Sequence, residues 1–365
     1  MDKKHNSRYP NSSQDALFLQ SITSTIDDFK MLKNEDLVLA AVSGGSDSIS
    51  LVLSLLALKN RYKIKIGIAH LNHMLRGEES LRDEIFVKKF AHKLGLPYFC
   101  RQVDVKAHAK QHGLSVEQAG RELRYAFFQH IADKHGYTKI ATGHNKNDNA
   151  ELVLMNLLRG SGPKGLSGIP PVRDNFYIRP LIRMPKQKIL DFLKLKDHDY
   201  MFDSSNNDMA YLRNKIRSQL LPLLESEFNP EIINALDRLS SILKSEENYF
   251  EMQTQKAFDC CLLQSDDLSV SLSKKQIFKL HPAILNRVLR KAIKAIKKNL
   301  SRITHAHIND IIQFSFNTIS GTSLDLPGQI RVYKKNDIII FKKEKNPLRD
   351  IGRQNKLMRK AAQKK

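Results

Sequence analysis

Apolar and polar positions alternate in blocks along the first half of the chain. Four short apolar runs, rich in β-branched residues, are separated by longer stretches with a helical period. The apolar runs are 37–42, 64–69, 98–103 and 139–142, and the helical stretches are 48–60, 80–94 and 115–135. Buried strands separated by helices predict βαβ units and a parallel sheet with right-handed crossovers. Since ligands of such sheets bind beyond the carboxyl ends of the strands, polar residues that follow a strand are the first candidates for chemistry.

The second half of the chain changes its pattern twice. Residues 211–227 predict a basic helix, and from there to about residue 314 the period is helical. Residues 329–334 and 338–342 predict two short strands joined by a turn. We therefore expect an α/β fold with an N-terminal parallel-sheet domain, followed by a helical module and a small β unit. The predicted segments are a flexible N-terminus at 1–20, the α/β domain at 21–226, the helical module at 227–318, a β-hairpin unit at 319–345 and a basic disordered tail at 346–365.

The net charge of the chain indicates which class of partner it binds. Its 365 residues include 60 Lys and Arg against 38 Asp and Glu, which gives a formal net charge of +22 and a pI near 9.8. Such a field attracts polyanions, and nucleic acid is the commonest large one in a cell. An evenly solvated lysine-rich surface is the alternative. Charge alone therefore favours nucleic acid without deciding it.

The location of the protein is indicated by what the chain lacks. Its longest apolar run, 49–58, is about half the ~20 residues that a membrane span needs, and residues 1–14 lack the apolar core of a secretory signal. Three cysteines without a CxxC pair fit a reducing compartment and provide no thiolate zinc or iron–sulfur site. We expect a cytoplasmic protein that has no membrane partner.

A glycine- and serine-rich loop follows the first predicted strand. Two glycines let the backbone approach a phosphate, successive N–H groups form an anion-binding nest, and the next helix adds the positive end of its dipole. Three serines offer hydroxyl donors. The Asp in the loop would repel a bare phosphate, so it implies a bridging Mg²⁺ or a helix cap. The loop is Ser43-Gly44-Gly45-Ser46-Asp47-Ser48.

This loop resembles the pyrophosphate loop (PP-loop) of ATP pyrophosphatases, and no Lys follows its glycines as in GxxxxGK[ST] phosphate loops. The resemblance implies ATP as co-substrate and adenylyl transfer as the reaction type. With further motifs it becomes specific, and the chain resembles the tRNA(Ile)-lysidine synthetases from about residue 36 to 226 and weakly on to 341. Those motifs are 69–77, 113–125, 141–151, 157–168, 203–206 and 213–217.

The family resemblance implies a particular reaction. ATP adenylates O2 of the wobble cytidine in an isoleucine tRNA with anticodon CAU, and the ε-amine of free L-lysine then displaces AMP from C2, giving lysidine. It also implies a PP-loop catalytic domain at 21–226, a tRNA-binding module at 227–318 and, more weakly, a homodimer. Asn145, Asn149 and Leu152 replace the His, Gln and Thr that family members usually carry. Longer members have a further C-terminal domain, which we expect this chain to lack.

Asp148 and Glu151 are the candidates for handling the lysine amine. They are i and i+3 on a predicted helix and so share one face. Two carboxylates can bind the arriving ammonium, and one can accept its proton. Service as Mg²⁺ ligands and a solvated acidic face are the two alternatives. Asp47 is the predicted metal ligand and also a candidate catalytic residue.

Histidine and arginine side chains complete the predicted site. His70 and His144 follow strand ends, where they can bind nucleotide phosphate or assist proton transfer, although a structural role is the commoner one for a single His. Arg121 is assigned to ATP by the family resemblance, against a surface ion pair. Arg213 and Arg217, four residues apart, suit phosphates or the charge on leaving AMP, against a solvated basic face.

The helical module carries the predicted RNA contacts. Cations surround an apolar stripe there, and such contacts position RNA without reading its sequence. A lysine-rich amphipathic helix on a small core explains the stripe equally well. The predicted tRNA-binding residues are Arg287, Arg290, Lys291, Lys294 and Lys298.

Two other functions compete with lysidine formation. A tRNA thiolase also adenylates a base, but its sulfur transfer commonly needs a reactive cysteine pair or cluster, and the sequence contains no CxxC. A non-catalytic RNA-binding relative would be expected to lose the phosphate loop, which is intact at 43–48.

Overall fold

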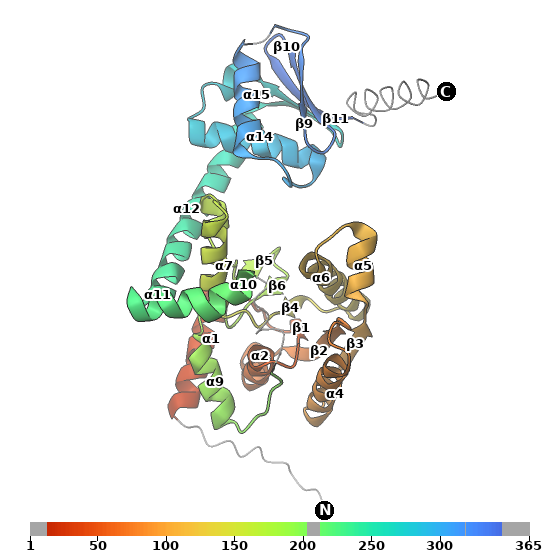
Figure 1. Ribbon diagram of the computed structural model, residues 1–365, viewed down its shortest axis with the longest axis vertical. Coiled ribbons are helices and arrows are strands. Elements are labelled where there is room, and N and C mark those ends of the chain that lie inside the picture. Colours follow the sequence, from red (N-terminus) through yellow and green to blue (C-terminus); the bar gives the residue numbers. More distant parts are fainter. Residues whose placement is uncertain (1–12, 203–211, 318, 345–365) are drawn as a thin grey trace, which may run out of the picture. The chain divides into compact units, whose positions relative to one another are not determined.

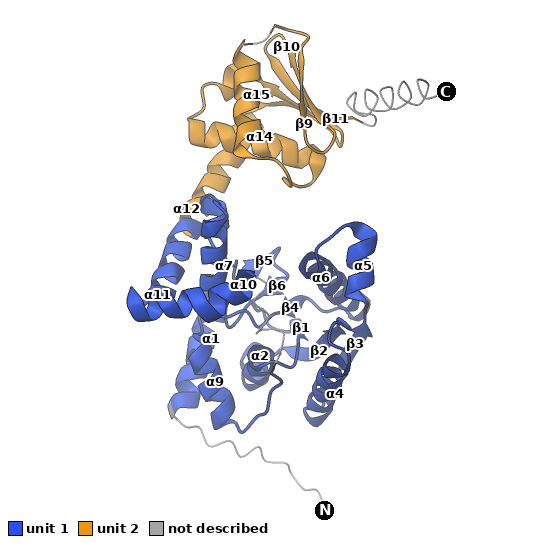
Figure 2. Ribbon diagram, in the orientation of Figure 1, with its two compact units in different colours: residues 1–244 blue, residues 245–365 orange. Residues whose placement is uncertain are grey.

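The computed structural model describes residues 13–202, 212–317 and 319–344. The chain divides into two compact units, Met1–Lys244 and Ser245–Lys365 (Figure 2). The motif at 203–206 and the tail at 346–365 lie outside the described residues.

The first unit is built on a six-stranded sheet with the order β3-β2-β1-β4-β6-β5 (Figure 1). All neighbours are parallel except β5, which runs antiparallel to β6. The first four strands coincide with the four apolar runs of the sequence to within three residues at each end. The strands are β1 Leu37–Ala41, β2 Lys65–Asn72, β3 Tyr98–Gln102, β4 Lys139–Ala141, β5 Val172–Arg173 and β6 Tyr177–Ile178.

Helices cover both faces of this sheet (Figure 1). A large core joins α1, α2, α4 and α9 to one face, and a second core packs α6 against the other. The predicted parallel α/β fold is confirmed, because buried apolar strands need cover on both faces. The helices are α1 Ser13–Asp28, α2 Ser46–Ala57, α3 Lys59–Tyr62, α4 Glu78–Lys93, α5 Val105–His112, α6 Val116–His135, α7 Lys146–Leu158, α8 Pro163–Leu166, α9 Lys186–Leu195, α10 Leu212–Lys215 and α11 Leu221–Glu227, with one π-helical turn at Ile216–Leu220 between the last two.

The first helix corrects the prediction of a flexible N-terminus at 1–20. Residues 13–20 form the first turns of α1, and Phe18 stacks on Phe192 of α9 with ring centroids 4.2 Å apart. Ile22 and Ile26 on the same helix are fully buried. The polar composition of residues 1–14 conceals this amphipathic start, because the apolar positions that anchor the helix come after it.

The second unit contains a five-stranded antiparallel sheet with the order β7-β8-β11-β10-β9. Two of its strands, β7 Leu262–Ser265 and β8 Ser269–Ser273, lie within the range 227–318 that was predicted to be helical throughout. That prediction is wrong there, because a serine-rich stretch has weak periodicity and β11 supplies the pairing partner of β8. The other elements are α12 Ile232–Cys261, which begins in the first unit, α13 Lys274–Ile277, α14 Pro282–Lys297, α15 His305–Asn317, β9 Ser323–Leu326, β10 Ile330–Lys335 and β11 Ile338–Lys343.

Length and hydropathy together rule out a bilayer-crossing helix within the described ranges.

Candidate active site

The phosphate loop joins β1 to α2 at the carboxyl edge of the sheet. Gly44 has φ +98°, a conformation that side chains disfavour, and Gly45 is the N-cap residue of α2. The Ser48 hydroxyl donates to the Gly45 carbonyl at 2.8 Å and lies 3.4 Å from the Ser43 hydroxyl. The loop thus places the N-terminus of α2 directly after β1, where a phosphate-binding nest would lie.

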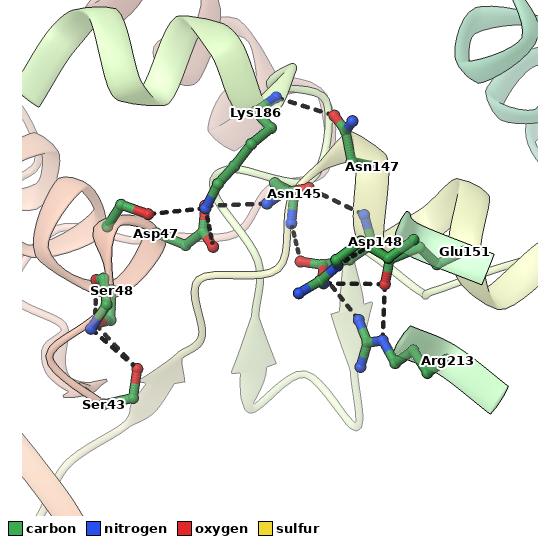
Figure 3. A network of polar contacts seen from close by, with 12 residues as sticks. Ser43, Asp47, Ser48, Asn145, Asn147, Asp148, Glu151, Lys186 and Arg213 are labelled. Carbon is green, nitrogen blue, oxygen red and sulfur yellow. Dashed lines mark hydrogen bonds and ion pairs between the residues drawn. The ribbon is translucent and has the colours of Figure 1, made fainter. Parts of the chain in front are cut away.

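Asp47 is held from two sides at the start of α2 (Figure 3). Lys186, the first residue of α9, donates to its Oδ2 at 2.8 Å and to the Ser46 hydroxyl at 2.8 Å. The Asn145 amide donates to Oδ1 at 3.0 Å. Burial raises the pKa of Asp47 above its ordinary value, although Lys186 opposes that shift. Lys186 was not among the predicted site residues, because nothing in its local sequence sets it apart from other lysines.

Asn145 links the phosphate loop to the acidic pair. It caps α7 by accepting from the backbone N–H of Asp148 at 3.0 Å, while Asp148 Oδ2 accepts from the backbone N–H of Asn145 at 3.0 Å. The same Asn side chain donates to Asp47. The segment before α7 approaches the start of α2 closely at Gly143, because a Cβ at this position would lie 3.0 Å from the Asp47 carbonyl carbon. The replacement of the usual His at this position therefore keeps a hydrogen-bonding side chain between the two halves of the site.

The acidic pair and the arginine pair meet each other (Figure 3). Glu151 accepts from Arg213 Nε at 2.8 Å and from Arg217 Nε at 2.6 Å. Asp148 Oδ1 accepts from Arg213 Nη2 at 2.7 Å and from Arg217 Nη2 at 3.1 Å. The Glu151 side chain is only 2% exposed and that of Asp148 11%. The alternative of a solvated acidic face is wrong, and the half-exposed arginines are paired with the two acids.

A π-helical turn sets the position of these arginines. Arg213 lies on α10 directly before the turn Ile216–Leu220, and Arg217 lies within it. Its wider backbone loop shifts the register of the side chains, and π-helical turns are frequent at functional sites. The spacing i and i+4 already predicts a shared face for the two arginines, and the tertiary structure decides that this face meets the carboxylates of α7.

The two candidate histidines lie at the same edge but are buried differently. His70 is 4% exposed, and its Nδ1 donates to the Val42 carbonyl at 2.8 Å. His144 Nδ1 lies 2.9 Å from the Thr142 hydroxyl. Burial and the neighbouring arginines lower the pKa of His144 to about 3, and burial lowers that of His70 as well. The low pKa leaves the His144 imidazole neutral at pH 7, which favours the predicted hydrogen-bonding role over proton transfer.

Comparisons with known proteins agree with this geometry. Residues 17–224 match the model of the PP-loop domain family. A tRNA(Ile)-lysidine synthase of Clostridioides difficile is 36% identical over 328 residues, which are 90% of this chain and 71% of that protein. The chain belongs to the tRNA(Ile)-lysidine synthase family. A second relative of that name, from Geobacter sulfurreducens, is 35% identical over 85% of this chain and 66% of its own length.

A solved structure shows the fold but not the reaction. A tRNA thiolase from Methanococcus maripaludis matches with a TM-score of 0.53 at 20% identity, over 65% of this chain and 82% of its own. This similarity is one of PP-loop architecture. The relatives named lysidine synthase match far more of the chain at higher identity.

Arg121 lies on α6, in the turn before Tyr125. Its guanidinium carbon is 5.1 Å from the centroid of the Tyr125 ring. Together with other arginines it lowers the pKa of His144. Arg121 is therefore close enough to His144, which follows β4, to border the candidate active site from α6.

The predicted tRNA contacts of the second unit lie on α14 and at Lys298, the residue after its last turn, and they differ in how far other groups of the protein engage them. Arg287 donates to Glu247 through both terminal nitrogens, one at 2.8 Å, and lies over the Phe250 ring. This buried pairing speaks against Arg287 as a phosphate contact. Lys291 lies 5.7 Å from the Phe258 ring centroid, and Arg290 is 3.5 Å from the Ile303 carbonyl. Lys294 and Lys298 are exposed, with Lys298 also 3.5 Å from Asp267.

A Mg²⁺ site has to be tested against the donor atoms that are present. Within the described ranges no group of three or more His, Cys, Asp or Glu side chains is arranged to hold a metal. Mg²⁺ bound with nucleotides commonly takes one or two carboxylates, the phosphates and several waters. Asp47, which points from the phosphate loop and accepts one hydrogen bond on each oxygen, fits that smaller requirement.

Proposed function

We propose that this chain catalyses lysidine formation on the wobble cytidine of an isoleucine tRNA with anticodon CAU, consuming ATP and free L-lysine. Membership of the tRNA(Ile)-lysidine synthase family supports the overall reaction. The observation that carries the assignment of residues is the bridge of Asn145 between Asp47 and Asp148. It places a phosphate loop and a pair of buried carboxylates side by side, as an adenylation followed by amine attack requires.

The adenylation half is assigned to the phosphate loop. The nest at Gly44 and Gly45, with the α2 dipole and the Ser43, Ser46 and Ser48 hydroxyls, would bind the phosphates of ATP. O2 of the cytidine attacks the α-phosphorus, the bond to the β-phosphate breaks, and pyrophosphate leaves. Lys186 lies 2.8 Å from both Ser46 and Asp47, so it is placed to share the negative charge of the departing pyrophosphate.

A Mg²⁺ ion would be held by Asp47 together with phosphate oxygens and water. When bound, it supplies charge neutralisation to the triphosphate. Asp47 would keep its contact with Asn145 in that arrangement, because each carboxylate oxygen has more than one lone pair.

The lysine half is assigned to Asp148 and Glu151. At pH 7 reaching the neutral amine of free lysine costs about 4.6 kcal/mol, since its pKa is near 10.4. Two carboxylates attract the ammonium, and one of them takes its proton as the amine bonds to C2 and AMP leaves. Because Arg213 and Arg217 now engage these carboxylates, we propose that the arginines turn toward the phosphate of the adenylate and free the acids for lysine.

His70, His144 and Arg121 are assigned supporting roles. His70 and Arg121 stay candidates for ATP contacts, and neutral His144 would position a substrate by hydrogen bonding. Lys298 and the α14 residues Arg290, Lys291 and Lys294 would contact tRNA phosphates. ATP, tRNA and lysine meet in the cytoplasm, so we place the reaction there, and a homodimer stays a prediction from the family.

The decisive experiment measures incorporation of labelled lysine into an unmodified isoleucine tRNA(CAU) transcript with ATP and Mg²⁺, following AMP release in parallel. An elongator methionine tRNA and a reaction without ATP are the controls. ATP-dependent incorporation with one AMP per lysine, sparing the methionine tRNA, is the expected result. Free lysine remaining unincorporated while ATP and tRNA bind would refute the assignment.

A pair of variants separates the chemistry from folding. Glu151→Gln removes one buried carboxylate, and Glu225→Gln removes an exposed carboxylate on α11 as a matched control. We expect the first to lose lysine incorporation and the second to retain it.

A further inference from the structure

Four arginines gather around Tyr125 beside strands β5 and β6, and one of them, Arg179, directly follows the carboxyl end of β6. We call them the arginine cluster: Arg121, Arg124, Arg173 and Arg179. They come from three places in the chain, α6, β5 and the residue after β6, so the tertiary fold collects them. Neither Arg173 nor Arg179 was a predicted site residue.

Aromatic rings fix the orientation of the outer guanidinium. The carbon of the Arg173 guanidinium lies 4.4 Å from the Tyr125 ring centroid and 4.2 Å from that of Tyr177. The two rings meet edge to face with centroids 5.0 Å apart. A guanidinium held between rings loses little entropy on binding a ligand, and its planar fork matches two phosphate oxygens.

Arg179 forms the buried base of the cluster. Arg179 is 3% exposed, and its Nη1 donates to the Pro170 carbonyl at 2.5 Å. In the part of the chain that the structure describes, the Nε of Arg179 is buried without a hydrogen-bond partner, whereas the Nε of Arg173 faces Asp174 Oδ2 at 3.4 Å. A buried donor is normally paired, so the Nε of Arg179 points to an acceptor supplied by a ligand.

The charge of the cluster is poorly balanced by the protein itself. Among the described residues its one ion pair joins Arg173 to Asp174 at 3.4 Å, and the Asp174 side chain is 79% exposed. Burial alone would raise the pKa of the Tyr125 hydroxyl, yet the cluster outweighs burial and lowers it. Like charges held together this way repel each other, and an anion bound between them relieves the repulsion.

Strand order places the cluster relative to the phosphate loop. β4 lies between β1, which the phosphate loop follows, and β6, which Arg179 follows. Ile178 pairs with Ala141, so Arg179 leaves the sheet beside Thr142 and close to His144. Two strand spacings of about 4.8 Å separate the two strand ends by roughly 10 Å. A phosphate bound at the cluster is therefore a different group from the one bound in the loop.

We propose that the arginine cluster binds a backbone phosphate of the substrate RNA next to the target base, with Arg173 and Arg179 as positioning residues. This inference rests on the proposed function, which requires a nucleotide base at the same edge. One phosphate fixed about 10 Å from the loop would hold the base against the α-phosphate of ATP. Tyr125 would add an aromatic face at the rim, as single-stranded RNA sites commonly have.

The test compares RNA and ATP binding by Arg173→Gln with the wild-type protein. Arg173 is chosen because its side chain is 32% exposed, so its loss leaves the fold intact. Arg179→Gln is the second variant, and Arg101→Gln, an exposed arginine on β3 at the opposite edge of the sheet, is the matched control. Thermal unfolding verifies that each variant is folded, and the probes are the unmodified tRNA transcript and ATP, each titrated alone over a range of salt concentrations.

The expected result is a roughly ten-fold weaker tRNA affinity for Arg173→Gln, the contribution of one charge-assisted hydrogen bond, with ATP affinity unchanged. The salt dependence of log K for tRNA should become shallower by about 0.7, the value for one single-strand phosphate contact. Arg101→Gln should match the wild type in both.

Two outcomes would overturn the inference. If ATP affinity falls while tRNA affinity holds, the cluster binds a phosphate of ATP. If a folded Arg173→Gln protein keeps both affinities, the cluster is structural. In either case the proposed function still holds if the wild-type protein incorporates lysine. The proposed function itself is refuted if the wild-type protein binds tRNA and ATP but does not incorporate lysine.

Discussion

Replacing Glu151 with Gln tests how the acidic pair serves both stability and lysine binding. The Glu151 side chain is 2% exposed and accepts three N–H donors from two arginines, at 2.6, 2.8 and 3.0 Å. Glutamine has nearly the same shape, but it removes the negative charge and turns an NH₂ group toward a guanidinium. The change therefore isolates the charge while it preserves the volume.

The expected cost to stability follows from the exposure of the partners. Breaking a fully buried ion pair costs about 3–5 kcal/mol, but the side chains of Arg213 and Arg217 are 42% and 41% exposed and regain water. We therefore expect the free energy of unfolding to fall by about 2 kcal/mol. Urea denaturation measures it, with Glu225→Gln as the control.

The kinetic cost is worked from the same interaction. If Glu151 contributes about 2 kcal/mol to holding the lysine ammonium, KM for lysine rises roughly 30-fold, since 1.4 kcal/mol corresponds to ten-fold. The rate at which the lysine amine attacks C2 also falls, because one acceptor for the ammonium proton is lost. Steady-state assays of lysine incorporation at varied lysine and fixed ATP give both values. An unchanged KM and kcat for lysine in a folded Glu151→Gln protein would refute the role of the acidic pair.

Three further perturbations test other parts of the molecule. Lys186→Met removes the cation beside Asp47, so the pKa of Asp47 should rise further and the acid limb of kcat/KM for ATP should move to higher pH, measured as pyrophosphate release against pH. Because the pKa of His144 is lowered to about 3, the unfolded chain binds a proton that the folded one does not as pH falls below about 6.5. Stability should therefore decrease by up to about 1.4 kcal/mol per pH unit from this group, and His144→Gln should remove that slope. The double change Lys294→Gln on α14 and Lys298→Gln directly after it should weaken tRNA binding and make its salt dependence shallower, with ATP binding unaffected.

Each of these outcomes has a counterpart that would contradict it. An unshifted acid limb in Lys186→Met would mean that another group controls ATP turnover. An identical slope of stability with pH in His144→Gln would assign the proton uptake elsewhere, and the similarly buried His73, whose pKa is lowered to about 4, is the next residue to test. Unaltered tRNA affinity in the lysine double variant would move the RNA contacts away from α14.

The sequence by itself determined the class of the fold and the reaction type. Strands and helices of the first unit follow from buried apolar runs and helical periods, because parallel strands covered on both faces must be apolar throughout. The loop Ser43–Ser48 could be recognised because its glycines and serines act through the local backbone, next to the strand that carries them. The candidates Asp148 and Glu151 likewise share a helix face by spacing alone.

Contacts between distant segments were decided by the tertiary structure. Lys186 reaches Asp47 across 139 residues, and Arg213 reaches Glu151 across 62, so no local pattern marks either pair. The low pKa of His144 depends on arginines from separate elements, and β7 and β8 form strands because β11 supplies the pairing partner of β8. Spacing along a chain encodes which side chains share a face, whereas the partner that each face meets is set by how the elements pack.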